Sequence, residues 1–164
     1  MIGDRWGVTD DEVARHYPCD DLLTAPALQV WRGVTVHAPA EAVWPWIGQI
    51  RLAPYSYDWI DNLGRRSPRE LRNLPAPVVG EPFTAVGGHK TGRILAVESE
   101  LHLTARIIGA ITSYVLVPDG EDACRLLMKI VTARGRLLAP ALSLGDLVMA
   151  RRQLLNLKRL AEGS

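Results

Sequence analysis

The stretch YSYDWIDN, residues 55–62, brings together the side chains of this sequence that could do chemistry: three aromatic rings among two carboxylates. Tyr57, Asp58 and Asp61 are residue types that move protons in acid–base catalysis, or that hydrogen-bond a polar ligand at the mouth of a pocket. A tyrosine beside a carboxylate also simply satisfies its own hydroxyl, and we favour this structural interpretation. Without a histidine or a third carboxylate nearby in sequence, the two aspartates predict no metal site.

No other stretch carries a recognisable catalytic or cofactor motif. GGHKTG, residues 87–92, has its lysine in the wrong place for a phosphate-binding loop, and it predicts a hairpin turn with His89 exposed. Two cysteines without a CxxC spacing predict neither a disulfide framework nor a zinc site. Four histidines in arm, strand and turn settings offer no Ser-His-Asp arrangement. We therefore expect no metal and no cofactor.

One strand places a charge where an apolar residue is expected. In GRILAVESE, residues 92–100, neither alternate face is purely apolar, because Glu98 lies on one face and Arg93 on the other. One face would then turn a charge inward, where it could fix the polar end of a ligand, since a buried charge needs a partner. A register break or an edge position explains the pattern equally well, and both alternatives stay open.

Size and composition are those of one globular domain. The 164 residues are 48% hydrophobic and 23% charged, enough for a real core and too apolar for disorder. A net charge of +1 gives no reason to expect nucleic acid as a partner. The N-terminus lacks the regions of a signal peptide, and the apolar stretch 137–149 is too short for a membrane span. We expect a cytoplasmic protein with an N-terminal arm, 1–28, and a single domain, 29–164.

The first half of the chain predicts short helices around one strand. Thr9 can cap a helix in the arm, and Glu12 three positions later completes a capping box. Residues 31–38 alternate as a half-buried strand. A helix follows at 40–50, which Pro45 should kink or shorten.

Residues 54–63 are predicted as a second short helix, which Gly64 ends. Its apolar arc, expected to help close one end of a pocket, consists of Tyr55, Trp59, Ile60 and Leu63. The following residues, 65–82, are rich in proline and arginine and predict a long loop. We interpret its arginines, at positions 65, 66, 69 and 72, as a solvated surface, although they could also dock an anionic membrane or ligand.

The second half predicts an antiparallel sheet followed by one long helix. Hairpin-length connections join strands at 82–86, 92–100, 101–107, 111–117 and 123–132. The last segment, 141–162, returns to helical spacing, with a leucine-rich stripe and basic residues mostly opposite it. A sheet with one apolar face can receive this stripe, and two layers meeting along a curved sheet can leave a ligand cavity.

This order of elements resembles the START-like helix-grip superfamily, in particular the polyketide cyclase/dehydratase and lipid-transport grouping often called SRPBCC. The matching phrases are VTVHAPAEAVWPWIGQI, YSYDWIDNLGR, ITSYVLVPDGEDACRLLMKIVTARG and RRQLLNLKRLAE. The resemblance implies an α+β fold in which a curved antiparallel sheet wraps around a long C-terminal helix, with two short helices after the first strand. It also implies a deep, mostly apolar cavity. It assigns no catalytic residue, because the family has no universal catalytic motif.

We expect the chain to bind a hydrophobic or amphipathic small molecule, such as a lipid or polyketide, between the sheet and the C-terminal helix. The residues expected to line this site are Tyr55, Tyr57, Trp59, Asp61, Glu98, Tyr114, Leu116, Met128 and Leu147. A cyclase/dehydratase-type enzyme that uses Tyr57, Asp58, Asp61 or Glu98 is one alternative. An interaction module without a ligand is the other. Transient membrane contact is compatible with the sequence, and the oligomeric state is left open.

Overall fold

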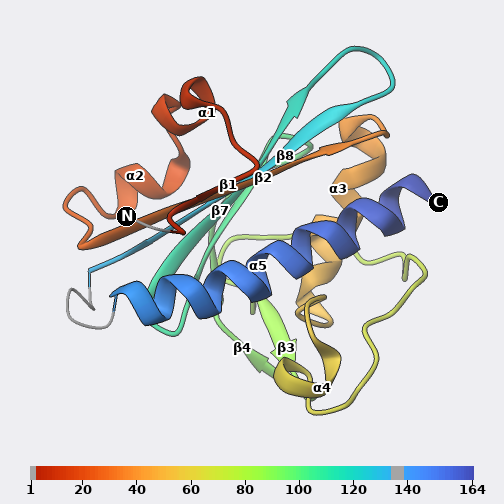
Figure 1. Cartoon of the computed structure of the whole chain (residues 1–164). Helices are drawn as coiled ribbons and strands as arrows, with labels where there is room; N and C mark the ends of the chain where they lie inside the picture. Colours follow the sequence, from red (N-terminus) through yellow and green to blue (C-terminus); the bar gives the residue numbers. More distant parts are fainter. Residues whose placement is uncertain (1–2, 134–138) are drawn as a thin grey trace.

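The computed structural model describes residues 3–133 and 139–164, with side chains everywhere in these ranges except at Asp61 and at 139–147. Over these residues the chain forms a six-stranded sheet in the order β1-β2-β8-β7-β6-β5, and a separate two-stranded sheet, β3-β4 (Figure 1). Neighbouring strands are antiparallel, except that β1 and β2 are parallel. The strands are β1 Arg5–Trp6, β2 Leu28–Val36, β3 Thr84–Val86, β4 His89–Thr91, β5 Arg93–Glu98, β6 His102–Ile107, β7 Ala110–Pro118 and β8 Cys124–Thr132.

The long helix α5, Ala139–Glu162, packs on one face of the six-stranded sheet (Figure 1). Successive side chains of a strand point to opposite faces, so Leu126 and Met128 of β8 share the face that meets the helix. They belong to the same buried cluster as Leu154 and Leu157 of α5. The predicted α+β arrangement, with a terminal amphipathic helix on an antiparallel sheet, is confirmed.

The N-terminal arm covers the other face of the sheet with two short helices, α1 (Asp10–Ala14) and α2 (Pro18–Leu22). Tyr17 and Cys19 are fully buried there, in a cluster with Leu127 of β8. Both faces of the sheet are therefore covered by helices, α5 on one side and the arm on the other (Figure 1).

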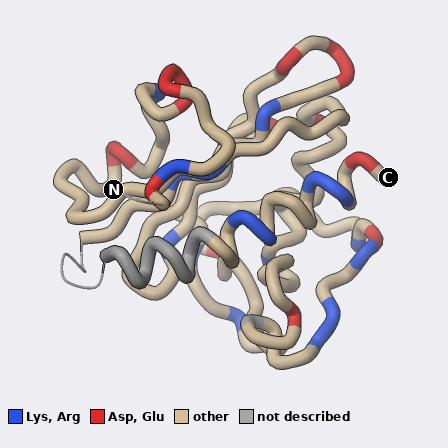
Figure 2. Tube along the Cα trace, viewed as in Figure 1, with Lys and Arg blue, Asp and Glu red and all other residues tan. Residues whose placement is uncertain are grey.

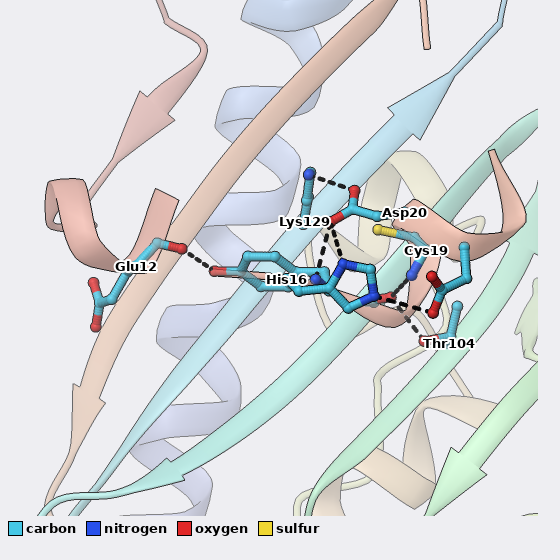
Figure 3. A network of polar contacts seen from close by, with 9 residues as sticks. Glu12, His16, Cys19, Asp20, Thr104 and Lys129 are labelled. Atoms are coloured by element: carbon cyan, nitrogen blue, oxygen red, sulfur yellow. Dashed lines mark hydrogen bonds and ion pairs between the residues drawn. The ribbon is translucent and has the colours of Figure 1, made fainter. Parts of the chain in front are cut away.

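Polar contacts fasten the arm to outward-facing side chains of the strands (Figure 3). The ammonium group of Lys129 in β8 pairs with the carboxylate of Asp20 in α2. The backbone N–H of Cys19 donates to Ser113 Oγ over 3.0 Å, and Ser113 Oγ lies 2.7 Å from Thr104 Oγ1. Because burying a polar group without a partner is costly, these contacts allow the arm to remove polar strand residues from water.

The short helices begin where their residue types indicate. The predicted capping box is confirmed: the N–H of Glu12 donates to Thr9 Oγ1, and the N–H of Thr9 donates to Glu12 Oε2. The helix predicted at 40–50 is α3, Ala40–Gly48, which contains Pro45 and is continued by a 3-10 turn, η1, Gln49–Arg51.

The helix predicted at 54–63 is wrong in its extent and in the side it buries. Only α4, Asp58–Asp61, is helical. Tyr55 has a left-handed backbone conformation, φ +58°, which a right-handed helix cannot contain. Tyr55 is buried, whereas Trp59 and Leu63 of the predicted apolar arc are exposed. The left-handed backbone at Tyr55, which accompanies the burial of its side chain, therefore prevents the helix that the local spacing of apolar residues predicts.

The glycine-rich turn after β3 is shorter than predicted. Gly87 and Gly88, both with positive φ, form the turn, and the next residues already belong to β4. β3 pairs with β4 outside the main sheet, so the strand predicted at 82–86 does not join that sheet. A Cβ at Gly87 would lie 2.6 Å from Leu63 Cδ1, which shows how closely this hairpin packs beside the α4 segment.

Candidate functional site

A pocket of about 470 Å³ lies beside the C-terminal half of α5. Segment 55–59, which includes the start of α4, forms one wall, and the loop at Ser67 and Arg69 forms a second. The third wall is the side of α5 that carries Arg152, Asn156, Arg159 and Leu160. None of these lining residues belongs to a strand, so the pocket lies between α5 and the α4 segment and not between α5 and the sheet.

Two amide side chains of α5 hold the first wall in place. Gln153 Nε2 donates to the carbonyl of Pro54 over 2.6 Å. Asn156 Nδ2 donates to the carbonyls of Tyr55, over 2.9 Å, and Ser56, over 3.2 Å. The left-handed backbone at Tyr55 costs about 1–3 kcal/mol. These hydrogen bonds help to offset that cost and fix the wall to the helix.

Tyr55 forms the inner end of this wall and belongs to the core. Its ring makes an edge contact with Trp46, with 6.4 Å between the ring centroids. Its hydroxyl donates to the carbonyl of Pro68 over 2.7 Å and accepts from Gln49 Nε2 over 2.7 Å. Burial raises the pKa of the Tyr55 hydroxyl, so this group stays neutral. Its role is to tie the loop to the core.

The carboxylate of Asp58 is also occupied by a structural contact. Asp58 Oδ1 accepts from Ser67 Oγ over 2.6 Å, and Asp58 Oδ2 accepts from the backbone N–H of Ser67 over 3.0 Å. A carboxylate that accepts at both oxygens holds the loop against α4 and is poorly placed to exchange a proton with a substrate.

Arginines from two segments line the pocket. Arg152 Cζ lies 5.6 Å from the centroid of the Tyr57 ring, within cation–π range. The Nε–H of Arg152 is buried, and none of the described residues accepts a hydrogen bond from it. Arg69 and Arg159 line this pocket and a neighbouring one of about 370 Å³. Among the described side chains that line the larger pocket, Asp58 carries the one carboxylate, and Glu70 lines the neighbouring pocket.

Three of the predicted site residues, Tyr55, Tyr57 and Trp59, line the pocket. They approach it differently, because Tyr55 is buried and Trp59 is 74% exposed. The side chains of Asp61 and Leu147, also predicted for the site, lie outside the described residues.

Glu98 lies elsewhere and does not turn inward. It is exposed at the end of β5, the outer strand of the main sheet, with its carboxylate 3.8 Å from His102 Nε2. A bulge between Ile94 and Ala96 shifts the register of β5 against β6. Both alternatives to an inward charge, a register break and an edge position, therefore apply to this strand.

Tyr114, Leu116 and Met128 are buried on the sheet face that meets α5. The hydroxyl of Tyr114 donates to Gln153 Oε1 over 2.7 Å, so it bridges the sheet to the helix. Together with Leu154, these residues pack as core where the helix side chains are described. They do not line the pocket beside α4.

Sequence reasoning missed the residues of α5 that line the pocket, among them Arg152, Asn156 and Arg159. The sequence shows them as the polar side of an amphipathic helix, and such a side is normally solvated. Their partner segment lies about a hundred positions earlier, since Asn156 and Tyr55 are separated by 101 residues. No local spacing signals a contact over that separation.

Neither a metal-binding cluster nor a membrane-spanning helix is found within residues 3–133 and 139–164. The His, Cys, Asp and Glu side chains with described positions nowhere gather in a group of three able to hold an ion. No helix in these ranges combines the length and the apolar character needed to cross a bilayer.

The known proteins that resemble this chain do so in structure. No protein-family model and no curated protein matches it. A Mesorhizobium loti protein is 18% identical, with a TM-score of 0.57 over 83% of this chain and 98% of the other. For a Nitrosomonas europaea protein the identity is 13% and the TM-score 0.52, over 84% and 96%. A Corynebacterium glutamicum protein described as polyketide-cyclase-like is 14% identical, with a TM-score of 0.51 over 85% and 94%.

At these identities the likeness concerns the fold. The similar structures cover most of this chain and nearly all of their own length. The order of elements agrees with the expectation from the sequence: a strand, short helices, an antiparallel run of strands and a long terminal helix. The chain therefore has the helix-grip fold expected from its sequence, shared with these structures, one of which is described as polyketide-cyclase-like.

Proposed function

We propose that this chain binds an acidic, partly apolar small molecule in the pocket between α5 and the α4 segment. The observation that carries the proposal is the presence of Arg69, Arg152 and Arg159 in the lining of one cavity of about 470 Å³. Arginine forms paired, charge-assisted hydrogen bonds with carboxylates and related anions. Asp58, the one described carboxylate in the lining, accepts from Ser67 at both oxygens, and none of the described residues accepts a hydrogen bond from the buried Nε–H of Arg152.

The remaining lining supplies the apolar contacts that a small-molecule site needs. The side chains of Tyr55, Tyr57, Trp59 and Leu160 border the same space. Ligand pockets are typically apolar walls with a few well-placed polar groups that fix orientation. An acid group beside the arginines and an apolar body against the rings would use both parts of this lining.

The expected cavity between the sheet and α5 remains a separate prediction. Where helix side chains are described, Ala150, Leu154 and Leu157 are buried in one cluster with the strands, which favours a sealed contact there. The side chains of the earlier part of the helix, 139–147, lie outside the described residues.

Binding of decanoate and of decanol, measured by isothermal titration calorimetry, tests the proposal. The two probes share an apolar chain and differ in charge. We expect decanoate to bind at least about tenfold more tightly, since one charge-assisted pair is worth roughly that factor. Arg152→Gln combined with Arg159→Gln should remove this preference and leave decanol binding nearly unchanged.

Arg93→Gln combined with Arg106→Gln is the matched control, because both arginines are exposed, on β5 and β6, and the pair makes the same change in net charge away from the pocket. It should leave both affinities unchanged. Equal affinity for decanoate and decanol in the wild-type protein would overturn the proposal. So would a double variant that keeps the preference for decanoate.

A further inference from the structure

The surface around α4 exposes apolar side chains that a monomeric globular domain normally buries. Trp59 is 74% exposed, Ile60 49% and Leu63 69%. These three residues lie within five positions of each other, in α4 and directly after it. A contiguous exposed apolar patch, especially one containing a tryptophan, marks a site of interaction with another molecule or with a membrane.

This patch is held in a fixed shape by contacts beneath it. Asn62 is buried, donating from Nδ2 to the carbonyl of Arg65 over 2.7 Å and accepting at Oδ1 from the N–H of Gly87 over 3.0 Å. Leu63 lies against Gly87, and the guanidinium group of Arg65 lies against Gly88. The patch and the tip of the β3-β4 hairpin therefore form one structural unit.

Cations border the exposed apolar residues. Arg65 and Arg66 follow Leu63 after one glycine and are exposed, and Lys90 is exposed on β4 of the adjoining hairpin. Figure 2 shows basic positions along the loop that leaves α4. The carboxylate of Asp58 accepts two hydrogen bonds from Ser67, and the side chain of Asp61 lies outside the described residues.

We propose that Trp59, Ile60, Leu63, Arg65 and Arg66, together called the α4 surface, dock onto an anionic lipid bilayer. Apolar side chains that enter the interface, with basic residues beside them, are the features by which proteins bind membranes peripherally. Tryptophan prefers the depth of the lipid headgroups, and arginine is attracted by the negative potential of anionic lipids. The positive charges of Arg65 and Arg66 favour an anionic bilayer over an uncharged partner.

Docking at this position places the mouth of the pocket next to the lipid. Trp59 belongs both to the α4 surface and to the lining of the pocket, and Arg69 of the lining follows four positions after Arg65. An acidic amphiphile could then move between bilayer and pocket over a short path. The docking itself stands on the exposed surface and does not depend on the pocket holding a ligand.

Cosedimentation with vesicles tests the proposal. Vesicles of phosphatidylglycerol mixed with phosphatidylcholine should bind the protein at least about tenfold more strongly than pure phosphatidylcholine vesicles, and added salt should weaken the binding. Brominated lipids should quench part of the tryptophan fluorescence. Trp59→Phe should remove this quenching, because the other four tryptophans are buried or half-buried.

Two double variants separate the apolar from the charged contribution. Ile60→Ser with Leu63→Ser, and Arg65→Gln with Arg66→Gln, should each weaken vesicle binding at least about fivefold. Matched double controls are Leu101→Ser with Ile108→Ser, at side chains 45% and 96% exposed, and Arg93→Gln with Arg106→Gln, at exposed positions on β5 and β6. Both controls should bind vesicles as the wild-type protein does.

None of the four substituted residues lines the pocket, so decanoate affinity should stay unchanged in both variants, and the two proposals can fail separately. Equal binding to both kinds of vesicle, or no binding, would overturn membrane docking. A concentration-dependent dimer that Ile60→Ser with Leu63→Ser abolishes, without vesicle binding, would overturn it in favour of a second copy of the chain. Equal losses in variants and controls would also overturn it.

Discussion

Arg125 of β8 forms a two-pronged ion pair with Glu12 of the arm, with 2.7 Å between Nε and Oε1 and a second bond of 2.9 Å to Oε2. Both side chains are about four-fifths buried. Glu12 also completes the capping box of α1. One carboxylate therefore caps the start of α1 and attaches this helix to the outer face of the sheet.

We predict that Glu12→Gln lowers the free energy of unfolding by about 2 kcal/mol, since a buried charged hydrogen bond is lost and Arg125 remains. The melting temperature should fall by about 4–8 °C for a domain of this size. Differential scanning calorimetry at neutral pH measures both quantities. Glu121→Gln, the same change at an exposed position in the β7-β8 turn, should cost almost nothing.

The same pair predicts a pH dependence. The hydrogen bond from Arg125 lowers the pKa of Glu12 below its ordinary value of 4.5. A depressed pKa in the folded state contributes stability that is full above the unfolded value and lost as pH falls through the folded value. The difference in unfolding free energy between wild type and Glu12→Gln should therefore be constant near neutrality and shrink below about pH 4.5. A difference that stays constant down to about pH 3 would contradict this account.

A pair of glycine substitutions measures how much stability depends on the close backbone contact between the arm and β2. Gly7 has φ +66°, and a Cβ there would lie 2.2 Å from the carbonyl oxygen of Gly33. Gly120 has φ +77° with open space around it. Gly120→Ala should cost about 1 kcal/mol for the left-handed backbone alone. Gly7→Ala should cost at least about 2 kcal/mol more, because the strands must separate. Urea denaturation measures the loss of stability in both variants. Equal losses would show that the arm moves away from β2 without cost.

Tyr114→Phe distinguishes the pocket beside α4 from a cavity under the helix. The change leaves Gln153 Oε1 without its donor from the sheet, so stability should fall by about 1 kcal/mol. Decanoate affinity should stay within about twofold of the wild-type value, because Tyr114 does not line the pocket beside α4. Weaker decanoate binding at unchanged stability would instead place the ligand between the sheet and α5.

The sequence predicts elements well where burial is periodic. In β8, Leu126 and Met128 alternate with Arg125 and Lys129 as predicted, because a strand between two layers sorts its residues by face. The partners of the side chains on the other face of β8 are harder to predict from the sequence. Arg125 and Lys129 look solvated in the pattern, yet each pairs with an arm carboxylate more than a hundred positions earlier.

The pocket could be predicted only in part, for the same reason. YSYDWIDN contributes Tyr55, Tyr57 and Trp59 to the lining, as its aromatic character indicates. The conformation of that stretch is set by Gln153 and Asn156 of α5, which bond its backbone carbonyls. A four-residue helix has too few positions for its periodicity to show which side it buries.

The two outer strands of the six-stranded sheet have a consequence for self-association. On one side, β1 is two residues long and belongs to an arm anchored by Glu12 and Arg125. On the other, β5 is interrupted by its bulge and carries exposed charges at both ends, Arg93 and Glu98. Long, regular, uncharged edge strands allow molecules to associate into fibrils through backbone hydrogen bonds. Neither β1 nor β5 is a long, regular, uncharged edge strand, and we therefore expect the six-stranded sheet to resist edge-to-edge association into fibrils.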